Sequence, residues 1–403
     1  MLLCVATPQS ALVGASATPP SRVAVVGGGL AGLATAFHLL NASAPLDALH
    51  VYDACAPGTG GASAAAARLL HPFTRTGGEI WRGRDGFAAT CALLRACEAH
   101  ASSPFCTASG LLRLALDEES TTALESAASA AHVGDEMRQE WLSRDDAAAS
   151  AGAALGGELG GAALAPAALS VDTPAYLRAL WALCEAEAAE SGADCRWIER
   201  RLGSLAELQS ADAAPYDAIV VATGARVIEL EELRGLRDLV TLCRGQNLLL
   251  ENAGGLKTPL ICGKYAVPVA AGAHVLAGAT FEYDPPETVH RPADADAAAA
   301  ALRPALARLH PALGSARVIG ATAGVRALPP RSHRGYVPLC GRLALPPEAA
   351  PAGVWLFGAL GSRGLIHHAL LGRAVATAVL AGDEAPLPEH TRRCEERLRE
   401  AVR

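Results

Sequence analysis

The sequence predicts an α/β fold, α+β overall, in which two kinds of sheet share one chain. The first observation is a β-α-β unit: the apolar strand Arg22–Val26 enters a glycine-rich turn, the helix Leu30–Leu40 follows, and Ala48–Tyr52 is the next strand. The second is the return of short apolar strands of the same kind far along the chain, at Asp217–Val221 and Val354–Phe357. The third is a run of short strands separated by turn residues, which favours an antiparallel sheet, at Gln246–Glu251, Leu260–Cys262, Tyr265–Val269 and His274–Gly278.

The remaining segments fill the space between these strands. Apolar spacing predicts helices at Gly86–His100, Thr173–Ser191, Ala295–His310 and Leu365–Ala381, with a strand at Gly110–Ala115 and an acidic helix from Glu118. Alanine content predicts a helix over Ser63–Leu70, and the Gly/Ala-rich segment Ala147–Ala168 is interpreted as a flexible connection or an edge hairpin.

We therefore expect a Rossmann-type domain assembled from discontinuous segments and a second domain with a mainly antiparallel sheet. The first comprises residues 22–95, 150–230 and 320–385, and the second comprises residues 96–149 and 231–319. Residues 1–21 are expected to be a leader, and residues 386–403 a charged terminal helix that includes Glu389–Arg403.

Composition narrows the classes of function. The 403 residues carry a formal net charge of −7, which disfavours a broad nucleic-acid surface. The 11 cysteines form no C-x-x-C pair, which indicates reduced thiols in an intracellular enzyme and no zinc site. No run of apolar residues suits a transmembrane helix. Met1–Ser21 contains no acid, so a cytoplasmic protein with a disordered leader and a chloroplast or mitochondrial transit-peptide remnant both stay open.

The turn after the first strand matches the dinucleotide fingerprint G-x-G-x-x-G at Gly27, Gly29 and Gly32. Gly27 permits the tight turn, Gly29 allows the backbone to approach a pyrophosphate, and Gly32 lets the helix pack close to the strand. The free N–H groups near Leu30 face the phosphates, and Asp53, 21 residues after Gly32, would accept hydrogen bonds from the adenosine ribose. The alternative is a glycine-rich turn without a ligand.

A second turn supports a flavin nucleotide. The strand Val220-Val221 ends in Ala222-Thr223-Gly224, where small residues let the backbone approach a nucleotide lying across the sheet. No second G-x-G-x-x-G is present, so a separate NAD domain is not expected. Electrons would enter from an organic substrate and leave to oxygen or another acceptor.

Together these motifs resemble the D-amino acid oxidase superfamily of FAD-dependent oxidoreductases. The motifs occur in that family's order over about Arg22 to Ala381, and are Val23–Gly32, Gly60–Ala67, Ala222–Gly224, Gly324–Arg326 and Gly358–Gly364. Within the family the chain is most similar to glycine oxidases and to the FAD domain of the bacterial tRNA 5-methylaminomethyl-2-thiouridine biosynthesis enzyme.

The resemblance implies FAD as cofactor and an enzyme that oxidises a C–N bond beside a carboxylate, by hydride transfer to flavin N5. The imine would hydrolyse, and oxygen would reoxidise the flavin and release peroxide. The residues expected to hold FAD are Gly27, Gly29, Leu30, Ala31, Gly32, Asp53, Ser63, Ala64, Ala65, Thr223, Gly224, Gly361, Ser362, Arg363, Gly364 and Leu365.

Three residues are candidates for catalysis by the same resemblance. Arg326 matches the arginine that grips the substrate carboxylate, for which its planar fork is suited; the alternative is an arginine paired to an acid where the domains join. Tyr265 matches an aromatic over the substrate, or is an ordinary strand tyrosine. Arg363 lies where the family wraps backbone around the flavin pyrimidine and would stabilise charge on N1–O2; the alternative is a surface loop arginine.

Arg68 departs from the family, which has glycine at that position. A long cation there could bind substrate or obstruct the flavin face, which puts simple glycine-oxidase activity in doubt. His71 follows and could lie near the site, although a lone histidine is more often structural. His367-His368 lack the partners of a metal site and are interpreted as helix surface or packing, so no metal is expected.

Three functions remain open at this point. The first is an amine or amino-acid oxidase whose partners are a small amine substrate and oxygen. The second is the FAD-dependent step of tRNA wobble-uridine modification, which the mild acidity and the absence of the relative's methyltransferase domain disfavour. The third is a flavin-binding scaffold without catalysis, favoured only by Arg68.

Overall fold

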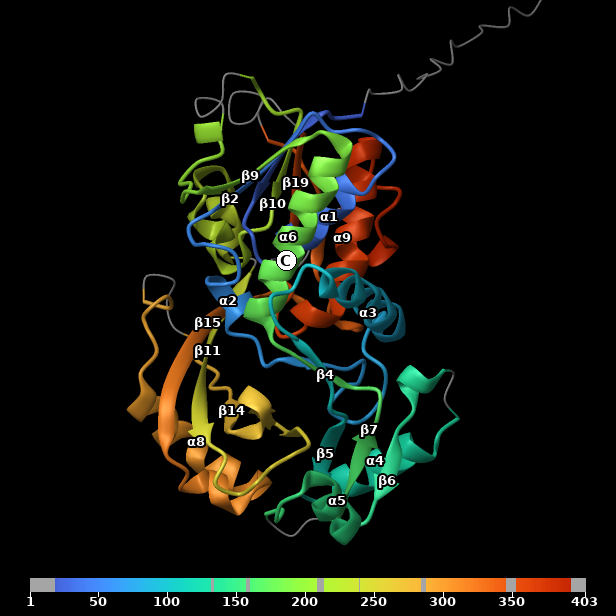
Figure 1. Ribbon diagram of the computed structural model, residues 1–403, viewed down its shortest axis with the longest axis vertical. Helices are drawn as coiled ribbons and strands as arrows, with labels where there is room; N and C mark the ends of the chain where they lie inside the picture. Colours follow the sequence, from blue (N-terminus) through green and yellow to red (C-terminus); the bar gives the residue numbers. More distant parts are fainter. Residues whose placement is uncertain are drawn as a thin grey trace, which may run out of the picture.

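The computed structural model describes residues 19–131, 134–156, 160–208, 214–238, 240–283, 288–345 and 353–392. Figure 1 shows two halves, one above the other, each built on its own sheet. The chain passes between the halves several times, so each half is assembled from segments that are far apart in the sequence. The Rossmann-type fold with a second, mainly antiparallel sheet is therefore confirmed.

The upper half contains a six-stranded sheet in the order β18-β19-β10-β1-β2-β9. Only β18 is antiparallel to its neighbour. The bounds are β1 Arg22–Val26, β2 Ala48–Asp53, β9 Asp194–Glu199, β10 Ala218–Val221, β18 Leu339–Leu343 and β19 Gly353–Gly358. Because β1, β10 and β19 run in the same direction, the turns that follow them meet at one edge of the sheet, where a parallel sheet binds its ligands.

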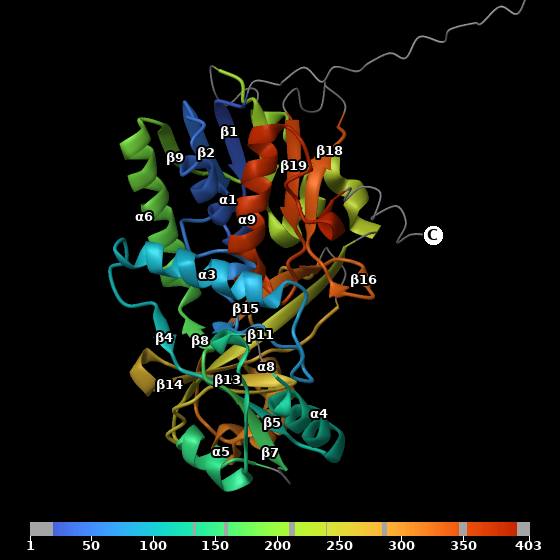
Figure 2. The same ribbon diagram turned by 90° about the vertical axis from the view of Figure 1, so that its right-hand side faces the viewer.

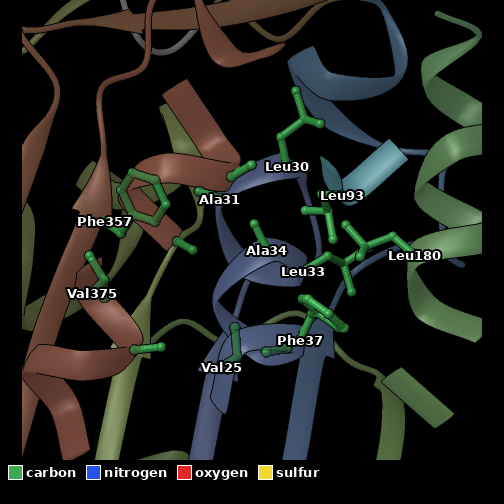
Figure 3. Packing of buried hydrophobic residues seen from close by; sticks show 14 of the residues in the cluster. Val25, Leu30, Ala31, Leu33, Ala34, Phe37, Leu93, Leu180, Phe357 and Val375 are labelled. Carbon is green, nitrogen blue, oxygen red and sulfur yellow. The ribbon is translucent and has the colours of Figure 1, made fainter. Parts of the chain in front are cut away.

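Helices α1 (Leu30–Leu40), α6 (Thr173–Ser191) and α9 (Gly364–Ala381) cover one face of this sheet, and α3 (Gly83–Glu98) packs against α9 and α6. Figure 3 shows the resulting core, in which apolar side chains of α1 pack between α6 and α9 above the strands. The other face is covered by the 3₁₀ segments η2 (Gly224–Glu229) and η3 (Glu231–Asp238), which pack into a second apolar cluster.

Helix α9 is long and apolar enough to cross a membrane by length and composition, and within the described ranges it alone passes that test. However, 67% of it is buried inside the structure, and it packs against α1 and α3. A Cβ added at Gly372 would lie 2.8 Å from the Cβ of Ala34, so the two helices are in close contact there. This burial is what a core helix requires.

The lower half contains an eight-stranded sheet in the order β15-β11-β14-β13-β12-β5-β7-β6, antiparallel except between β12 and β5. The bounds are β5 Leu111–Ala115, β6 Glu140–Leu142, β7 Gly161–Ala165, β11 Thr241–Glu251, β12 Leu260–Cys262, β13 Lys264–Val269, β14 His274–Gly278 and β15 Val318–Leu328. Helix α8 (Ala295–Leu309) packs on one face and forms a third apolar core. Figure 2 shows the long strands β11 and β15 reaching from this sheet toward the upper half.

Smaller elements complete the fold. They are helices α2 Gly61–Ala64, α4 Glu118–Ser129 and α5 Arg144–Ala151, strands β3 Leu69–Leu70, β4 Cys106–Ala108 and β8 Leu169–Val171 in a three-stranded sheet, the hairpin β16 Arg331–Ser332 and β17 Gly335–Tyr336, and the 3₁₀ segments η1 Asp135–Met137, η4 Ala270–Gly272, η5 Pro311–Gly314 and η6 Glu389–Thr391.

Two expectations about elements are wrong. The segment Ser63–Leu70 is not a helix: α2 ends at Ala64, Arg68 has a φ of 64°, and Leu69-Leu70 pair with β8. A left-handed residue cannot continue a helix, so the chain becomes extended. Of the two alternatives for Ala147–Ala168, the flexible connection is wrong for the described strand β7, which pairs antiparallel with β5 and with the edge strand β6 and has its alanines buried.

The expected domain boundaries differ from sheet membership at two strands. β7 and β15 lie in the eight-stranded sheet, although the sequence analysis assigned residues 150–230 and 320–385 to the Rossmann-type domain. Both strands are held there by long cross-strand pairing, β15 to β11 and β7 to β5. The expected leader lies outside the described residues up to position 18, and so does the terminal helix from position 393.

Candidate functional site

A cavity of about 550 Å³ lies between the two halves and is lined by residues of both. From the upper half come the N-terminal ends of α1 and α9 and the turn after β10; from the lower half come strands β5, β11, β12, β13 and β15. Its size is that of a small-molecule or cofactor site.

The N-terminus of α1 opens into this cavity through Gly29, Leu30 and Ala31. Gly29 is the N-cap residue and has no side chain to accept a hydrogen bond, and no charged side chain of the described cavity lining neutralises the positive end of the helix. A Cβ at Gly29 would lie 2.9 Å from the Oγ of Ser63, which accepts the N–H of Leu30 at 3.1 Å. The site thus has room for an anion next to the backbone but none for a side chain.

Gly27 and Gly32 hold the turn without lining the cavity. Gly27 has a φ of 105°, and a Cβ there would lie 2.5 Å from the carbonyl oxygen of Ala222. A Cβ at Gly32 would lie 1.8 Å from the carbonyl oxygen of Gly27. Both glycines are required by close backbone contact, as the fingerprint predicts.

Asp53 also lies outside the cavity, at the carboxyl end of β2. Its two carboxylate oxygens accept the backbone N–H groups of Gly28 (2.7 Å) and Cys55 (2.9 Å). It therefore ties the glycine turn to the end of the second strand, and its role toward a ribose stays a prediction.

The N-terminus of α9 faces the same cavity. Its first turn is preceded by Ala359 and Gly361, both with positive φ, and Arg363 caps it without a side-chain hydrogen bond. Two helix N-termini therefore converge on one cavity, an arrangement that favours a ligand with negative charge at two places. FAD has such charges, on its pyrophosphate and, when reduced, on its pyrimidine edge, so the residues present fit this cofactor.

Most of the residues predicted to hold FAD come together here. Those that line the cavity are Gly29, Leu30, Ala31, Ser63, Ala65, Gly224, Gly361, Ser362, Arg363, Gly364 and Leu365. Gly27, Gly32, Asp53, Ala64 and Thr223 do not line it. Thr223 borders a separate, smaller void, and its buried hydroxyl has no hydrogen-bond partner within the described residues.

Arg326 reaches the cavity from β15. Its guanidinium donates to the Ser362 hydroxyl at 3.1 Å and to the carbonyl of Thr280 at 3.1 Å, and it lies 4.7 Å from the centre of the Phe281 ring. All of these partners are neutral. Within the described part of the chain Arg326 has no ion pair, so its charge is available to a ligand.

Tyr265 reaches the cavity from β13. Its hydroxyl donates to Oδ1 of Asn247, whose Nδ2 donates to the carbonyl of Ala65 at 2.8 Å. Burial raises the pKa of the Tyr265 hydroxyl. The tyrosine is thus fixed in orientation and stays protonated, and the chain of hydrogen bonds joins the lower sheet to the segment after α2.

Three further residues line the cavity and were not predicted from the sequence: Asn247, Arg113 and Phe281. For Arg113 a signal was present: it is a charged residue in the middle of the apolar strand Leu-Leu-Arg-Leu-Ala. Asn247 and Phe281 gave no comparable signal, because their position depends on strand register.

The charge of the cavity is one-sided. Arg75, Arg113, Arg326 and Arg363 line it, and its described lining contains no Asp or Glu. His71 also lines it, and burial, with Arg113 and Arg363 nearby, lowers the pKa of its imidazole to about 3, so the ring is neutral. Burial also lowers the pKa of Arg363. The charge of this lining favours an anionic ligand.

Arg68 does neither of the things expected of it. It does not line the cavity, because its side chain turns away to form an ion pair with Asp172 (Nη1 to Oδ2, 2.6 Å). His367 and His368 are both fully buried, so they serve packing and are not on the helix surface. Among the residues that the structure describes, no three potential metal ligands come together.

Comparisons with known proteins identify the family of the chain. The family model described as "DAO: FAD dependent oxidoreductase" matches residues 22–378. The tRNA 5-methylaminomethyl-2-thiouridine biosynthesis bifunctional protein MnmC of Caulobacter sp. (strain K31) is 31% identical over 380 residues, which are 93% of this chain and 57% of that protein. The chain therefore spans little more than half the length of this relative.

Solved structures share the fold. Glycine oxidase from Geobacillus kaustophilus matches with a TM-score of 0.69 and 21% identity, over 90% of this chain and 95% of that one. Iminodiacetate oxidase from Chelativorans sp. BNC1 matches with a TM-score of 0.68 and 22% identity, over 92% and 98%. The L-proline dehydrogenase of P. horikoshii matches with a TM-score of 0.68 and 15% identity, over 93% and 97%.

Proposed function

Because the chain belongs to the DAO family of FAD-dependent oxidoreductases, we propose that it oxidises the C–N bond of an amino acid or secondary amine beside a carboxylate, with oxygen as the acceptor. The observation that carries this proposal is Arg326. Its guanidinium lines the cavity that the two helix N-termini also border, with only neutral partners among the described residues. Such a group binds a carboxylate at a fixed place relative to a cofactor.

In this proposal, bound FAD supplies the acceptor for the hydride. Arg326 holds the carboxylate, and Ser362 and the carbonyl of Thr280 keep its guanidinium in place. Tyr265 stays protonated and therefore orients the substrate without acting as a base. Arg363 and the N-terminus of α9 stabilise negative charge at the pyrimidine edge.

The positive charge of the cavity lining also affects the protonation of the substrate amine. No carboxylate of the described lining could accept a proton from it or hold it as a cation. Nearby positive charges lower the pKa of an amine, so the cavity favours the neutral form. A neutral nitrogen has the lone pair that assists loss of the hydride from the adjacent carbon.

The test is anaerobic bleaching of the oxidised flavin. Purified protein is mixed without oxygen with glycine, sarcosine, proline and D-amino acids, and the absorbance of the flavin is followed. We expect at least one carboxylate-bearing amine to bleach it and to generate peroxide once air is admitted. Bleaching by none of them would contradict the proposal, and a protein that binds no FAD would contradict it at an earlier step.

A second candidate is a flavin step on a modified tRNA nucleoside. The relative of 31% identity favours it, and so do three exposed aromatics: Phe281, which lines the cavity, and Tyr283 and Tyr336. Tyr283 lies near Arg326 and Tyr336, and exposed aromatics near a cationic site can stack on bases. Flavin bleached by modified tRNA but by no free amine would establish this candidate instead.

The third candidate, a scaffold without catalysis, depended on Arg68. The ion pair with Asp172 accounts for this residue and leaves the cavity open. No other feature of the described chain favours the scaffold.

A further inference from the structure

Arg113 is a buried cation for which the described protein provides no counter-charge. It lies in the middle of β5, is 7% exposed, and has no hydrogen bond or ion pair among the described residues. Burial lowers the pKa of Arg113 most, and the nearest titratable groups that affect it are the Cys262 thiol, which burial keeps neutral, and another arginine, Arg75. A buried guanidinium without a partner is costly, and such a group is retained where a ligand pairs with it.

Strand register places Arg113 in the substrate side of the cavity. Arg113 pairs with Ile261, Ile261 pairs with Tyr265, and Tyr265 pairs with Gly278, so their side chains lie on one face of the sheet. Arg113 is two strands from Tyr265, which is about 10 Å at the usual strand spacing. Arg326 comes from β15, on the other side of Tyr265 in the order of strands.

His71 adds a second donor beside Arg113. Its Nδ1 accepts the backbone N–H of Phe73 at 3.2 Å. In the neutral ring the proton is then on Nε2, which has no partner among the described residues. Arg113 and Arg363 both lie near enough to His71 to affect its protonation. The part of the cavity around Arg113 and His71 is therefore lined by hydrogen-bond donors, and its described lining contains no carboxylate.

We propose that Arg113 and His71 form a second oxyanion site, and that the natural amine substrate carries two oxyanion groups. The group beside the reacting C–N bond binds Arg326, and the second group binds Arg113 and the Nε2–H of His71. This inference rests on the proposed function for the assignment of Arg326. The second oxyanion is a carboxylate of a small amine or a phosphate.

Arg113 and the fingerprint come from different halves of the protein, so this site is distinct from the one expected for the cofactor's phosphates. The α1 N-terminus, at Gly29–Ala31, belongs to the upper half, whereas Arg113 comes from the lower sheet. Replacing Arg113 is therefore expected to leave FAD content unchanged. Loss of FAD from the variant would overturn the proposal, because Arg113 would then hold the cofactor.

The first experiment compares two nearly isosteric N-substituted glycines as reductants of the flavin in the absence of oxygen. N-(2-carboxyethyl)glycine carries the second carboxylate, and N-(2-carbamoylethyl)glycine replaces it with a neutral amide. We expect the wild type to bind the carboxylate at least tenfold more tightly. Arg113→Gln should remove this preference, measured as the ratio of the two affinities, and Arg113→Lys should restore part of it. A preference that survives in Arg113→Gln would overturn the proposal.

The second experiment does not depend on turnover. Thiodiacetate carries two carboxylates and methylthioacetate carries one, and neither has a C–N bond to oxidise. Binding is measured by the change in flavin absorbance. We expect thiodiacetate to bind at least tenfold more tightly to the wild type and the two to bind equally to Arg113→Gln.

The two experiments can refute the second oxyanion site and the proposed oxidation independently of each other. If no amine reduces the flavin but thiodiacetate still prefers the wild type, the second site stands and the proposed oxidation falls. If amines reduce the flavin but neither pair is distinguished, the second site falls alone. A further arm with N-(2-phosphonoethyl)glycine identifies the source of the oxyanion: tighter binding than the carboxylate indicates a phosphate, and weaker binding indicates a carboxylate.

Discussion

The three fingerprint glycines, Gly27, Gly29 and Gly32, have different structural roles, and of these three only Gly29 lines the cavity. Gly27 and Gly32 are fixed by backbone contacts that leave no room for a Cβ. Gly29 borders the cavity, and its missing side chain leaves the first turn of α1 open beside Ser63. The sequence predicted these separate roles because the motif itself carries them.

Gly29→Val is expected to abolish FAD binding without unfolding the protein. The branched side chain would stand at the end of α1, where phosphate oxygens must reach the backbone N–H groups. The ratio of flavin to protein absorbance after reconstitution measures this. Gly320→Val is the matched control, because nothing lies within 4 Å of a Cβ at that strand position, and it should keep its flavin. A full complement of FAD in the Gly29 variant would contradict the assignment.

Arg326→Ala is expected to weaken the binding of carboxylate substrates by on the order of 2–4 kcal/mol in the transition state. FAD should be retained, because the guanidinium contacts only Ser362, Thr280, Cys243 and Phe281 among the described residues. The measurement is kcat/KM for oxidation of the best amine. Arg331→Ala, an exposed arginine on the β16–β17 hairpin, is the control. Equal kinetics for Arg326→Ala and the wild type would remove Arg326 from the site.

At the scale of elements, the sequence predicted best where apolar spacing was strong. The helix Thr173–Ser191 and the parallel strands agree with the structure almost to the residue. Alanine-rich segments could not be predicted in this way, because alanine favours helices yet also fits a crowded strand. In Ser63–Leu70 the left-handed φ of Arg68 ends the helix, and in Ala147–Ala168 the pairing of β7 with β5 and β6 makes a strand.

Asp172 joins two of these elements, and this suggests a test of Arg68. Its Oδ1 caps α6 by accepting the N–H of Ala175 at 3.1 Å, and its Oδ2 pairs with Arg68. Asp172→Ala is expected to lower the free energy of unfolding by about 1–2 kcal/mol. Arg68→Gly loses the half-exposed ion pair but relieves a positive φ, so its net change should be within about 1 kcal/mol.

Urea unfolding of both variants measures these changes. Arg68→Gly should also keep the wild-type rate of flavin reduction by the best amine, since its side chain is directed at Asp172. A folded Arg68→Gly protein that holds FAD but is no longer reduced would show that Arg68 contacts the substrate.

At the scale of the molecule, the site is assembled from residues that no local pattern links. Tyr265, Asn247 and Arg113 become neighbours only through the register of strands β11 to β14, β13, β12 and β5. The sequence could therefore supply the cofactor half of the site, where the residues lie in short motifs. The substrate half depends on long-range pairing, and there only the residues marked by the family resemblance could be predicted.

Acid stability is also a property of the whole molecule, because several histidines are buried as neutral rings. Burial lowers the pKa of His38 and His368 to about 4 and that of His367 to about 3. The ordinary value in an unfolded chain is about 6.5. The unfolded chain therefore takes up these protons first, and the free energy of unfolding falls as the pH falls from about 6.5 toward 4.

His367 offers the sharpest test of this acid sensitivity. It is fully buried on α9 against Trp81, and neither ring nitrogen has a hydrogen-bond partner in the described structure. At pH 5 the unfolded chain binds a proton at His367 and the folded protein does not, which lowers the free energy of unfolding by about 2 kcal/mol. At pH 8 neither state binds this proton, so the free energy of unfolding is unaffected. His367→Leu should therefore gain about 2 kcal/mol relative to the wild type at pH 5 beyond any gain at pH 8. Urea unfolding of the FAD-saturated protein at both pH values measures the difference, with the exposed His333→Leu as the control for loss of a histidine as such. A gain that is the same at pH 5 and pH 8 would mean that His367 is not the acid-sensitive group.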